Sequence, residues 1–207
     1  MRSELEPKTL RTIAGLTDHP PRLADATLIV IDAQVAYTAE GQLALTGVAD
    51  AAKRIAGLLA QARSAGGPII HVAHLGPEGS AFDPVGGGRF MGEAAPNDGE
   101  HVVSKSLPNA FAGTTLLELL KGFESRPLIL CGFMTHMCVS STARAALDLG
   151  FETTIVSDAT ATRDLPGTIG QEIVSAAAVH HASLAALADR FSIVATTDEI
   201  LESRPAG

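Results

Sequence analysis

The sequence is poor in residues on which several classes of protein depend. Its 207 residues include two cysteines, one tyrosine and no tryptophan. Two cysteines, Cys131 and Cys138, cannot supply the disulfide framework of a small secreted protein, and they fit a reduced chain in the cytoplasm. The 15 lysines and arginines are outnumbered by 23 acidic residues and are scattered along the chain, so no basic surface for nucleic acid is expected.

Long hydrophobic runs are missing as well. No apolar stretch approaches the roughly 20 residues of a membrane span. Residues 1–22 mix charges and prolines with short apolar steps, which is unlike the hydrophobic region of a secretory signal. We therefore predict a cytoplasmic protein that binds neither nucleic acid nor membrane and that acts on a small molecule.

Apolar residues are nevertheless abundant. They make up 46% of the chain and are spread along its length, which predicts one sizeable core and a single domain over residues 1–207. Within that domain, residues 1–22 are expected to form an N-terminal extension that wraps around the core or frays.

Short apolar runs rich in β-branched residues alternate with longer helical patterns. Runs of this kind are typical of strands that are buried on both faces. The six expected strands cover residues 27–31, 68–72, 101–103, 127–131, 153–156 and 192–195. The four expected helices cover residues 48–65, 114–122, 137–149 and 171–189, with Gly66, Gly122 and Gly150 as expected helix ends.

This alternation predicts parallel pairing through right-handed crossovers. The expected fold is a three-layer α/β/α architecture of the Rossmann-like kind, with a mostly parallel six-stranded sheet between two layers of helices.

One segment departs from the alternation. Residues 74–99 contain seven glycines and three prolines and show no sustained period. Loops of this length in a compact domain are usually functional, and we interpret this one as an active-site loop, with a solvated surface excursion as the alternative. Its three consecutive glycines, 86–88, neither follow a strand nor open a helix, so they do not indicate a dinucleotide site.

In parallel sheets the functional site lies beyond the carboxyl ends of the strands. Asp32 follows the first strand, Lys105 the third, and Cys138 stands near the start of the helix after the fourth. A helix N-terminus and a nearby lysine both favour a thiolate, while an aspartate beside the thiol can take its proton and return it to a leaving amine. Each residue also has a structural alternative: a packed cysteine, a solvated lysine and a capping aspartate.

Three histidines raise the question of a metal. His71 and His74 point to opposite faces of a strand because they are three residues apart, and His101 comes much later. We predict no metal and no cofactor, with His71 in the core and His74 at a pocket wall.

Three blocks of sequence carry a resemblance to a known family. They are LIVIDAQ around Asp32, SKSLPNAFAGT around Lys105, and LCGFMTHMCVSSTARAALDLGF around Cys138, followed by TTIVSDATATRDLP. From about residue 25 to residue 200 the chain resembles the isochorismatase-like cysteine hydrolases, which include nicotinamidases, N-carbamoyl amidases, ureidohydrolases and isochorismatases.

The resemblance implies an Asp-Lys-Cys triad of Asp32, Lys105 and Cys138, which would hydrolyse an amide, carbamoyl or ureido C–N bond through a thioester. It also implies an oxyanion site made by the backbone N–H groups of Met134 and Cys138, with a cis peptide bond between Phe133 and Met134. Members of the family commonly form dimers or tetramers, so a homo-oligomer is expected.

The sequence also departs from parts of the family. The Asp-x-His group of metal-dependent nicotinamidases is replaced here by HVAHLGPEG, which argues against nicotinamide. Two alternatives stay open: hydrolysis of a vinyl ether with Asp32 as the acid, and a member of the family without catalytic activity. The candidate substrate-binding residues are Gln34, His74, Arg89, Phe90, Phe111 and His136.

Overall fold

A six-stranded parallel sheet forms the centre of the molecule. The computed structural model describes residues 6–123, 126–168, 170 and 172–203, and its sheet has the order β3-β2-β1-β4-β5-β8 with every neighbouring pair parallel. The strands are β1 (Thr27–Ile31), β2 (Ile69–His74), β3 (His101–Lys105), β4 (Leu128–Phe133), β5 (Thr153–Ala161) and β8 (Ile193–Ala195). The predicted three-layer α/β/α fold is confirmed.

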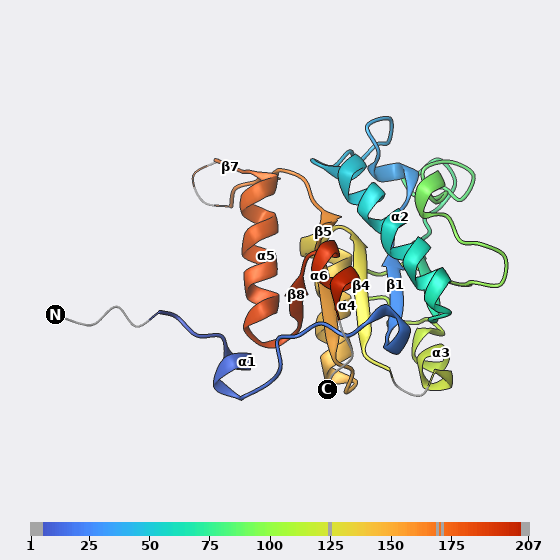
Figure 1. The fold of residues 1–207 in the computed structure, drawn as a ribbon. Helices are drawn as coiled ribbons and strands as arrows, with labels where there is room; N and C mark the ends of the chain where they lie inside the picture. Colours follow the sequence, from blue (N-terminus) through green and yellow to red (C-terminus); the bar gives the residue numbers. More distant parts are fainter. Residues whose placement is uncertain (1–5, 124–125, 169, 171, 204–207) are drawn as a thin grey trace.

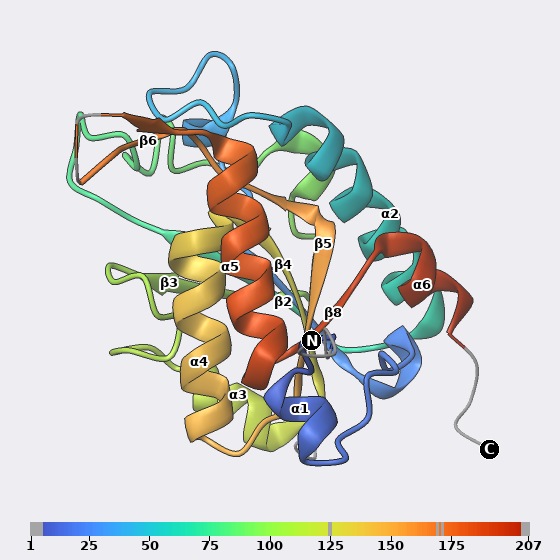
Figure 2. The ribbon, with the colours of Figure 1, turned by 90° about the vertical axis from the view of Figure 1, so that its left-hand side faces the viewer.

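Helices cover both faces of this sheet. Figure 2 shows α2 (Val48–Ala65) and α6 (Thr197–Glu202) on one side, and α3 (Leu116–Gly122), α4 (Ser140–Asp148) and α5 (Ala176–Arg190) on the other. Alternate residues of β1 serve the two layers, because Leu28 and Val30 pack with α2 whereas Ile29 and Ile31 pack with α3, α4 and α5. Burial on both faces explains why the strands read as continuous apolar runs.

The C-terminal third differs from the prediction. Helix α5 begins at Ala176, where the Ser175 hydroxyl accepts a hydrogen bond from the Ala178 N–H, and not at residue 171, which lies outside the described residues. An unpredicted two-stranded antiparallel sheet, β6 (Leu165–Pro166) and β7 (Ile173–Val174), precedes it. Figure 1 shows β7 at the end of α5 that lies level with the carboxyl ends of the strands.

The expected helix ends are partly confirmed. Gly66 has a φ of 68° and its N–H bonds the carbonyls of the last turn of α2, and Gly150 has a φ of 86° just beyond α4. Gly122 is the last residue of α3, as the expected helix over residues 114–122 had it, although Phe123 and not a glycine is the cap residue. Glycine favours the first two positions because it has no Cβ to oppose a left-handed backbone.

The described part of the N-terminal extension, residues 6–22, wraps around the core. Its short helix α1 (Leu10–Ile13) was not predicted; the Leu10 N–H donates to Asp189 of α5 at 2.9 Å. The Arg11 side chain is buried and donates to the Thr17 carbonyl. Residues 1–5 lie outside the described part of the chain.

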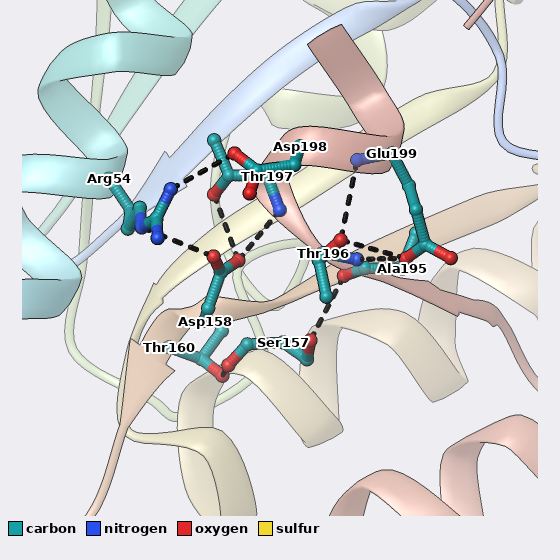
Figure 3. A network of polar contacts seen from close by, with 9 residues as sticks. All are labelled: Arg54, Ser157, Asp158, Thr160, Ala195, Thr196, Thr197, Asp198 and Glu199. Atoms are coloured by element: carbon teal, nitrogen blue, oxygen red, sulfur yellow. Dashed lines mark hydrogen bonds and ion pairs between the residues drawn. The ribbon is translucent and has the colours of Figure 1, made fainter. Parts of the chain in front are cut away.

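Strand β5 is interrupted by a bulge that the sequence did not reveal. Leu130 of β4 pairs with Ile155, but Gly132 pairs with Thr160, so β5 carries three more residues than β4 between the two pairs. Figure 3 shows how Asp158, at the bulge, contacts α6: it accepts hydrogen bonds from the N–H and hydroxyl of Thr197 at 2.7 and 2.8 Å and pairs with Arg54 of α2. The bulge therefore links β5 to both helices on that face.

None of the helices in the described part of the chain is long and apolar enough to cross a membrane.

Candidate active site

Three buried side chains meet where β1, β3 and β4 end. Asp32 follows β1, Lys105 is the last residue of β3, and Cys138 lies in the turn after β4. The Lys105 Nζ is 2.7 Å from Asp32 Oδ2 and 3.3 Å from Cys138 Sγ. None of the three residues is more than 4% exposed. The structure thus brings together the three residues that the sequence singled out.

The backbone at Asp32 directs its side chain toward this meeting point. Asp32 has a φ of 51°, a left-handed conformation that aspartate tolerates better than most residues. Its N–H donates to the Val72 carbonyl at 2.8 Å, and its carbonyl accepts from the Gln34 N–H at 2.8 Å. These bonds turn the chain away from the sheet immediately after β1.

Gly132 allows β4 to pass close to β1 at the same place. It has a φ of 112°, and a Cβ at this position would lie 1.9 Å from the Ile31 carbonyl oxygen. No other residue type fits without moving one of the two strands. The close approach brings the turn that carries Cys138 beside Asp32.

That turn is a π-helical segment, Thr135–Val139, which leads directly into α4. The expected cis peptide bond between Phe133 and Met134 is present. The sequence placed Cys138 near the start of an α-helix from residue 137; the helical segment instead begins at Thr135 and its first turn is wider than an α-helix. The Met134 carbonyl accepts from the N–H groups of Met137 and Val139, the two neighbours of Cys138.

Electrostatics around Cys138 differ from the sequence-based expectation of a thiolate. Burial and the charge of Asp32 raise the pKa of the Cys138 thiol to about 12, and the opposing effect of Lys105 is smaller. The cysteine is therefore a thiol at neutral pH in the resting site. Burial likewise raises the pKa of Asp32, and the Lys105 charge opposes that rise.

His74 extends the cluster. It pairs with Lys105 across β2 and β3, and its Nδ1 lies 3.3 Å from Lys105 Nζ. Burial, followed by the Lys105 charge, lowers the pKa of His74, so this histidine is neutral at pH 7. Phe82, from the long loop, lies over its ring with the centroids 4.7 Å apart. The predicted active-site loop thus contacts a neighbour of Lys105.

Gln34 anchors that loop to the sheet. Its Nε2 donates to the carbonyls of His74 and Gly88, at 2.9 and 2.6 Å, and its Oε1 accepts from the His74 N–H at 2.9 Å. The side chain is fully buried. Gln34 was expected to contact substrate, and the structure gives it backbone partners on both sides instead.

Three other candidate substrate contacts have partners outside the triad. Arg89 is exposed and donates to the Gly86 carbonyl of its own loop, Phe90 packs against the fully buried His71, and Phe111 stacks on Phe151 with centroids 6.2 Å apart. None of these three contacts involves Asp32, Lys105 or Cys138.

His136 lies nearer to the cluster, two residues before Cys138. Its Nδ1 is 2.6 Å from the hydroxyl of Thr162, which follows β5. Burial and the charge of Arg163 lower the pKa of His136. Arg163 was not among the predicted residues, and its buried Nε has no hydrogen-bond partner in the described part of the chain. Arg163 lies two residues after the end of β5, but the strand expected from the sequence ended at residue 156, so the sequence did not place Arg163 at the carboxyl edge.

Tyr37 was also not predicted. It is 2% exposed, its ring meets Phe82 and Phe133 edge to face, and burial together with the charge of Asp32 raises its pKa. It therefore lies between the long loop and the triad residues, as a neutral phenol.

The histidines have partners other than a metal. His71 Nε2 is 2.8 Å from Glu100 Oε2, His74 faces Lys105, and the exposed His101 packs on Phe123. Within the ranges that the structure describes, no three His, Cys, Asp or Glu side chains are grouped to hold an ion.

Known proteins resemble this chain in both sequence and fold. The sequence model of the isochorismatase domain matches residues 26–199. A crystal structure of an isochorismatase from Pseudomonas putida is 43% identical, covers 94% of this chain and 99% of its own, and superposes with a TM-score of 0.88. A secreted isochorismatase effector of Verticillium dahliae is 34% identical over 93% of this chain and 98% of its own length. A maleamate amidohydrolase of Pseudomonas putida is 32% identical over 63% of this chain and 70% of its own.

Proposed function

This chain belongs to the isochorismatase family of hydrolases, and on that premise we propose that it hydrolyses the C–N bond of a small amide, carbamoyl or ureido compound through a thioester on Cys138. The observation that carries the proposal is the buried contact of Lys105 with both Asp32 and Cys138. The maleamate amidohydrolase among the relatives acts, by its name, on an amide, which supports this type of bond.

The first half of the reaction moves one proton and exchanges one bond. The Cys138 thiol gives its proton to the Asp32 carboxylate while the sulfur attacks the carbonyl carbon of the substrate. The tetrahedral intermediate then collapses: the C–N bond breaks, the leaving nitrogen takes the proton from Asp32, and ammonia or an amine departs. A thioester remains on Cys138.

The second half uses water as the nucleophile. Asp32 takes a proton from water as its oxygen attacks the thioester carbonyl, and the C–S bond breaks to release the acid product. The sulfur recovers the proton from Asp32, which restores the thiol and the carboxylate. Each step uses only protein groups, substrate and water.

The electrostatics of the cluster favour this proton exchange. A raised pKa makes the Asp32 carboxylate a better base toward a thiol whose pKa is about 12, because the difference between the pKa values of the thiol and the carboxyl group becomes smaller. Lys105 keeps one positive charge beside whichever partner is negative, so the total charge of the site is the same before and after transfer. In this proposal Lys105 stabilises the thiolate in the transition state and not in the resting enzyme.

The carbonyl oxygen becomes negative during both attacks. We assign its stabilisation to the N–H groups of Met134 and Cys138. The Met134 carbonyl bonds the N–H groups of Met137 and Val139, on either side of Cys138, and so holds the turn that carries the Cys138 N–H. In this proposal the substrate would lie beside His74 and Tyr37, which both contact Phe82 of the long loop, and near His136, two residues before Cys138.

A second candidate function is hydrolysis of a vinyl ether with Asp32 as the acid. Two observations favour it: burial raises the pKa of Asp32, which is the direction that a general acid needs, and the effector from Verticillium dahliae is named as an isochorismatase. In this route Cys138 forms no bond with the substrate.

One experiment separates the two routes. The wild-type enzyme is assayed for ammonia release on a panel of small amides, carbamoyl compounds and ureides, and for isochorismate hydrolysis, before and after treatment with iodoacetamide. Cys138→Ser is assayed beside it. We expect ammonia release from at least one class of substrate, lost in both the alkylated enzyme and the variant. Isochorismate hydrolysis that persists in Cys138→Ser, with no ammonia release from any compound, would favour the ether route.

A further inference from the structure

A histidine from a distant part of the chain contacts the turn that carries Cys138. His180 is half-buried in α5, and its Nδ1 lies 2.9 Å from the hydroxyl of Thr135. Thr135 is fully buried and is the first residue of the π-helical turn Thr135–Val139. Helix α5 thus makes a polar contact with the segment between Met134 and Cys138, the two residues whose N–H groups are proposed to bind the substrate oxygen.

The ring of His180 is neutral at pH 7, because burial, followed by the charge of His181, lowers its pKa. A neutral imidazole carries one N–H and one bare nitrogen. When Nε2 carries the N–H, Nδ1 accepts from the Thr135 hydroxyl, so this hydrogen bond links the turn to α5.

Apolar residues pack α5 against the same turn. Leu184 and Leu187 of α5 lie in one buried cluster with Cys138 and Val139. Leu184 follows His180 by about one helical turn, so the hydrogen bond to Thr135 comes from a helix whose position is already fixed by packing.

We propose that His180 is a positioning residue, which acts through Thr135 to hold the turn Thr135–Val139 so that the N–H groups of Met134 and Cys138 face the reacting carbonyl oxygen. The inference rests on the proposed thioester route. An N–H group stabilises an oxyanion only at a hydrogen-bonding distance, so a small shift of the turn lowers the rate of attack while the fold persists.

The adjacent residue is a matched control. His181 lies on the same helix and is exposed, and its Nδ1 contacts only the Ala177 carbonyl of its own helix among the hydrogen bonds of the described residues. Replacing His181 changes the same residue type in the same helix without touching the turn.

The test compares two reactions of the same sulfur. Acylation by p-nitrophenyl acetate passes through an oxyanion, whereas alkylation by iodoacetamide does not. The acylation rate of Cys138 is measured as the release of p-nitrophenolate. We expect His180→Leu to lower this rate by about tenfold or more and to leave the alkylation rate within about twofold of wild type. His181→Leu should change neither rate. Cys138→Ser supplies the background release for every variant.

Conservative variants separate positioning from packing. His180→Asn keeps an acceptor near the place of Nδ1 and should recover most of the acylation rate, and Thr135→Val should reproduce the loss seen in His180→Leu. Combining Thr135→Val with His180→Leu should cost no more than either alone, because both break the same link. Thr135→Val and His180→Asn still decide the matter if His180→Leu fails to fold.

The outcomes are distinct. Equal losses in acylation and alkylation, or equal effects of His180→Leu and His181→Leu, would show that His180 has no specific effect on the oxyanion site and would overturn the inference while leaving the thioester route intact. If wild-type Cys138 is alkylated but never acylated, the proposed function fails, and the inference fails with it.

Discussion

Lys105 and Asp32 form an ion pair whose side chains are both fully buried, with Nζ 2.7 Å from Oδ2. A buried pair of this kind is costly to break, because either partner alone becomes an uncompensated charge in a medium of low polarity. The same ion pair therefore affects both the stability of the fold and the reaction proposed for the site.

Replacing Lys105 should destabilise the fold in a pH-dependent way. Burial already raises the pKa of Asp32 above its ordinary value, and losing the lysine raises it further. A folded-state pKa above the unfolded one means that folded chains bind more protons, so stability falls as pH rises through that interval. We expect Lys105→Met to lose about 3 kcal/mol or more at pH 8 and less at pH 5, measured by denaturant unfolding.

The exposed Lys121 provides the control, since Lys121→Met should be neutral at both pH values. The double variant Asp32→Asn with Lys105→Met removes both charges and should recover most of the stability at pH 8 without regaining activity. A loss that is the same at pH 5 and pH 8 would contradict the coupling.

The two cysteines should differ in reactivity. Cys131 is fully buried in β4, and burial raises the pKa of its thiol further than that of Cys138. Iodoacetamide should therefore modify Cys138 first, as followed by mass spectrometry. The rate should rise about tenfold per pH unit from pH 7 to pH 9 because the thiolate fraction of a group with a pKa of about 12 is still growing there.

Substitutions give the second half of this prediction. Cys138→Ser should remove amide turnover and keep the fold, whereas Cys131→Ala should cost about 1 kcal/mol of stability and keep the turnover. A plateau of the alkylation rate below pH 8, or near-normal turnover in Cys138→Ser, would refute the assignment of a resting thiol that becomes the nucleophile.

Glu100 should stabilise the end of the long loop at neutral pH. Its carboxylate bonds Arg63 at 2.7 and 3.0 Å and accepts from the Asn97 N–H at 2.9 Å; these contacts and His71 lower its pKa to about 2. A lowered pKa contributes stability above the ordinary pKa near 4.5, and that contribution disappears as the pH falls toward 2.

We therefore expect Glu100→Gln to lose on the order of 2 kcal/mol at pH 7 and progressively less below pH 4.5, measured by urea unfolding at several pH values. Glu118→Gln, an exposed position on α3, serves as the control and should have little effect. A loss for Glu100→Gln that does not shrink in acid would mean that packing, and not the carboxylate charge, stabilises the loop.

Gln34 should set the position of the long loop. Gln34→Ala removes three hydrogen bonds to the backbone of His74 and Gly88 and leaves those groups buried without partners. We expect a loss of about 2 to 4 kcal/mol in stability and a larger rise in KM than fall in kcat, because Phe82 is carried by the loop and the triad is not. The exposed Gln61→Ala is the matched control, and an unchanged KM for Gln34→Ala would argue against the loop as part of the substrate site.

Amide hydrolysis should survive treatment with a chelator. His71 is engaged by Glu100 and His74 faces Lys105, so the two histidines of β2 are poorly placed for one ion. Turnover measured after EDTA treatment and dialysis should equal that of untreated enzyme. Activity that is lost and then restored by added zinc or iron would reinstate a catalytic metal.

The sequence by itself determined the layers and the order of the chain. Apolar runs such as TLIVI are buried on both faces, and their alternation with helices leaves few topologies other than a parallel sheet. The sequence also placed Asp32 and Lys105 at the carboxyl edge of the sheet. The end of every parallel strand lies at that edge, whatever the order of the strands. These predictions depend only on the local pattern of apolar residues and on its periodicity along the chain.

Only the tertiary structure decided which polar groups face one another. Gln34 was expected to contact substrate and instead anchors a loop, the thiol of Cys138 was expected to be ionised and has a raised pKa, and His180 contacts the catalytic turn from a distant helix. Hydrogen bonds and pKa values depend on burial and on neighbours brought together by folding, and residues 40 or 45 positions apart share no local signal in the sequence.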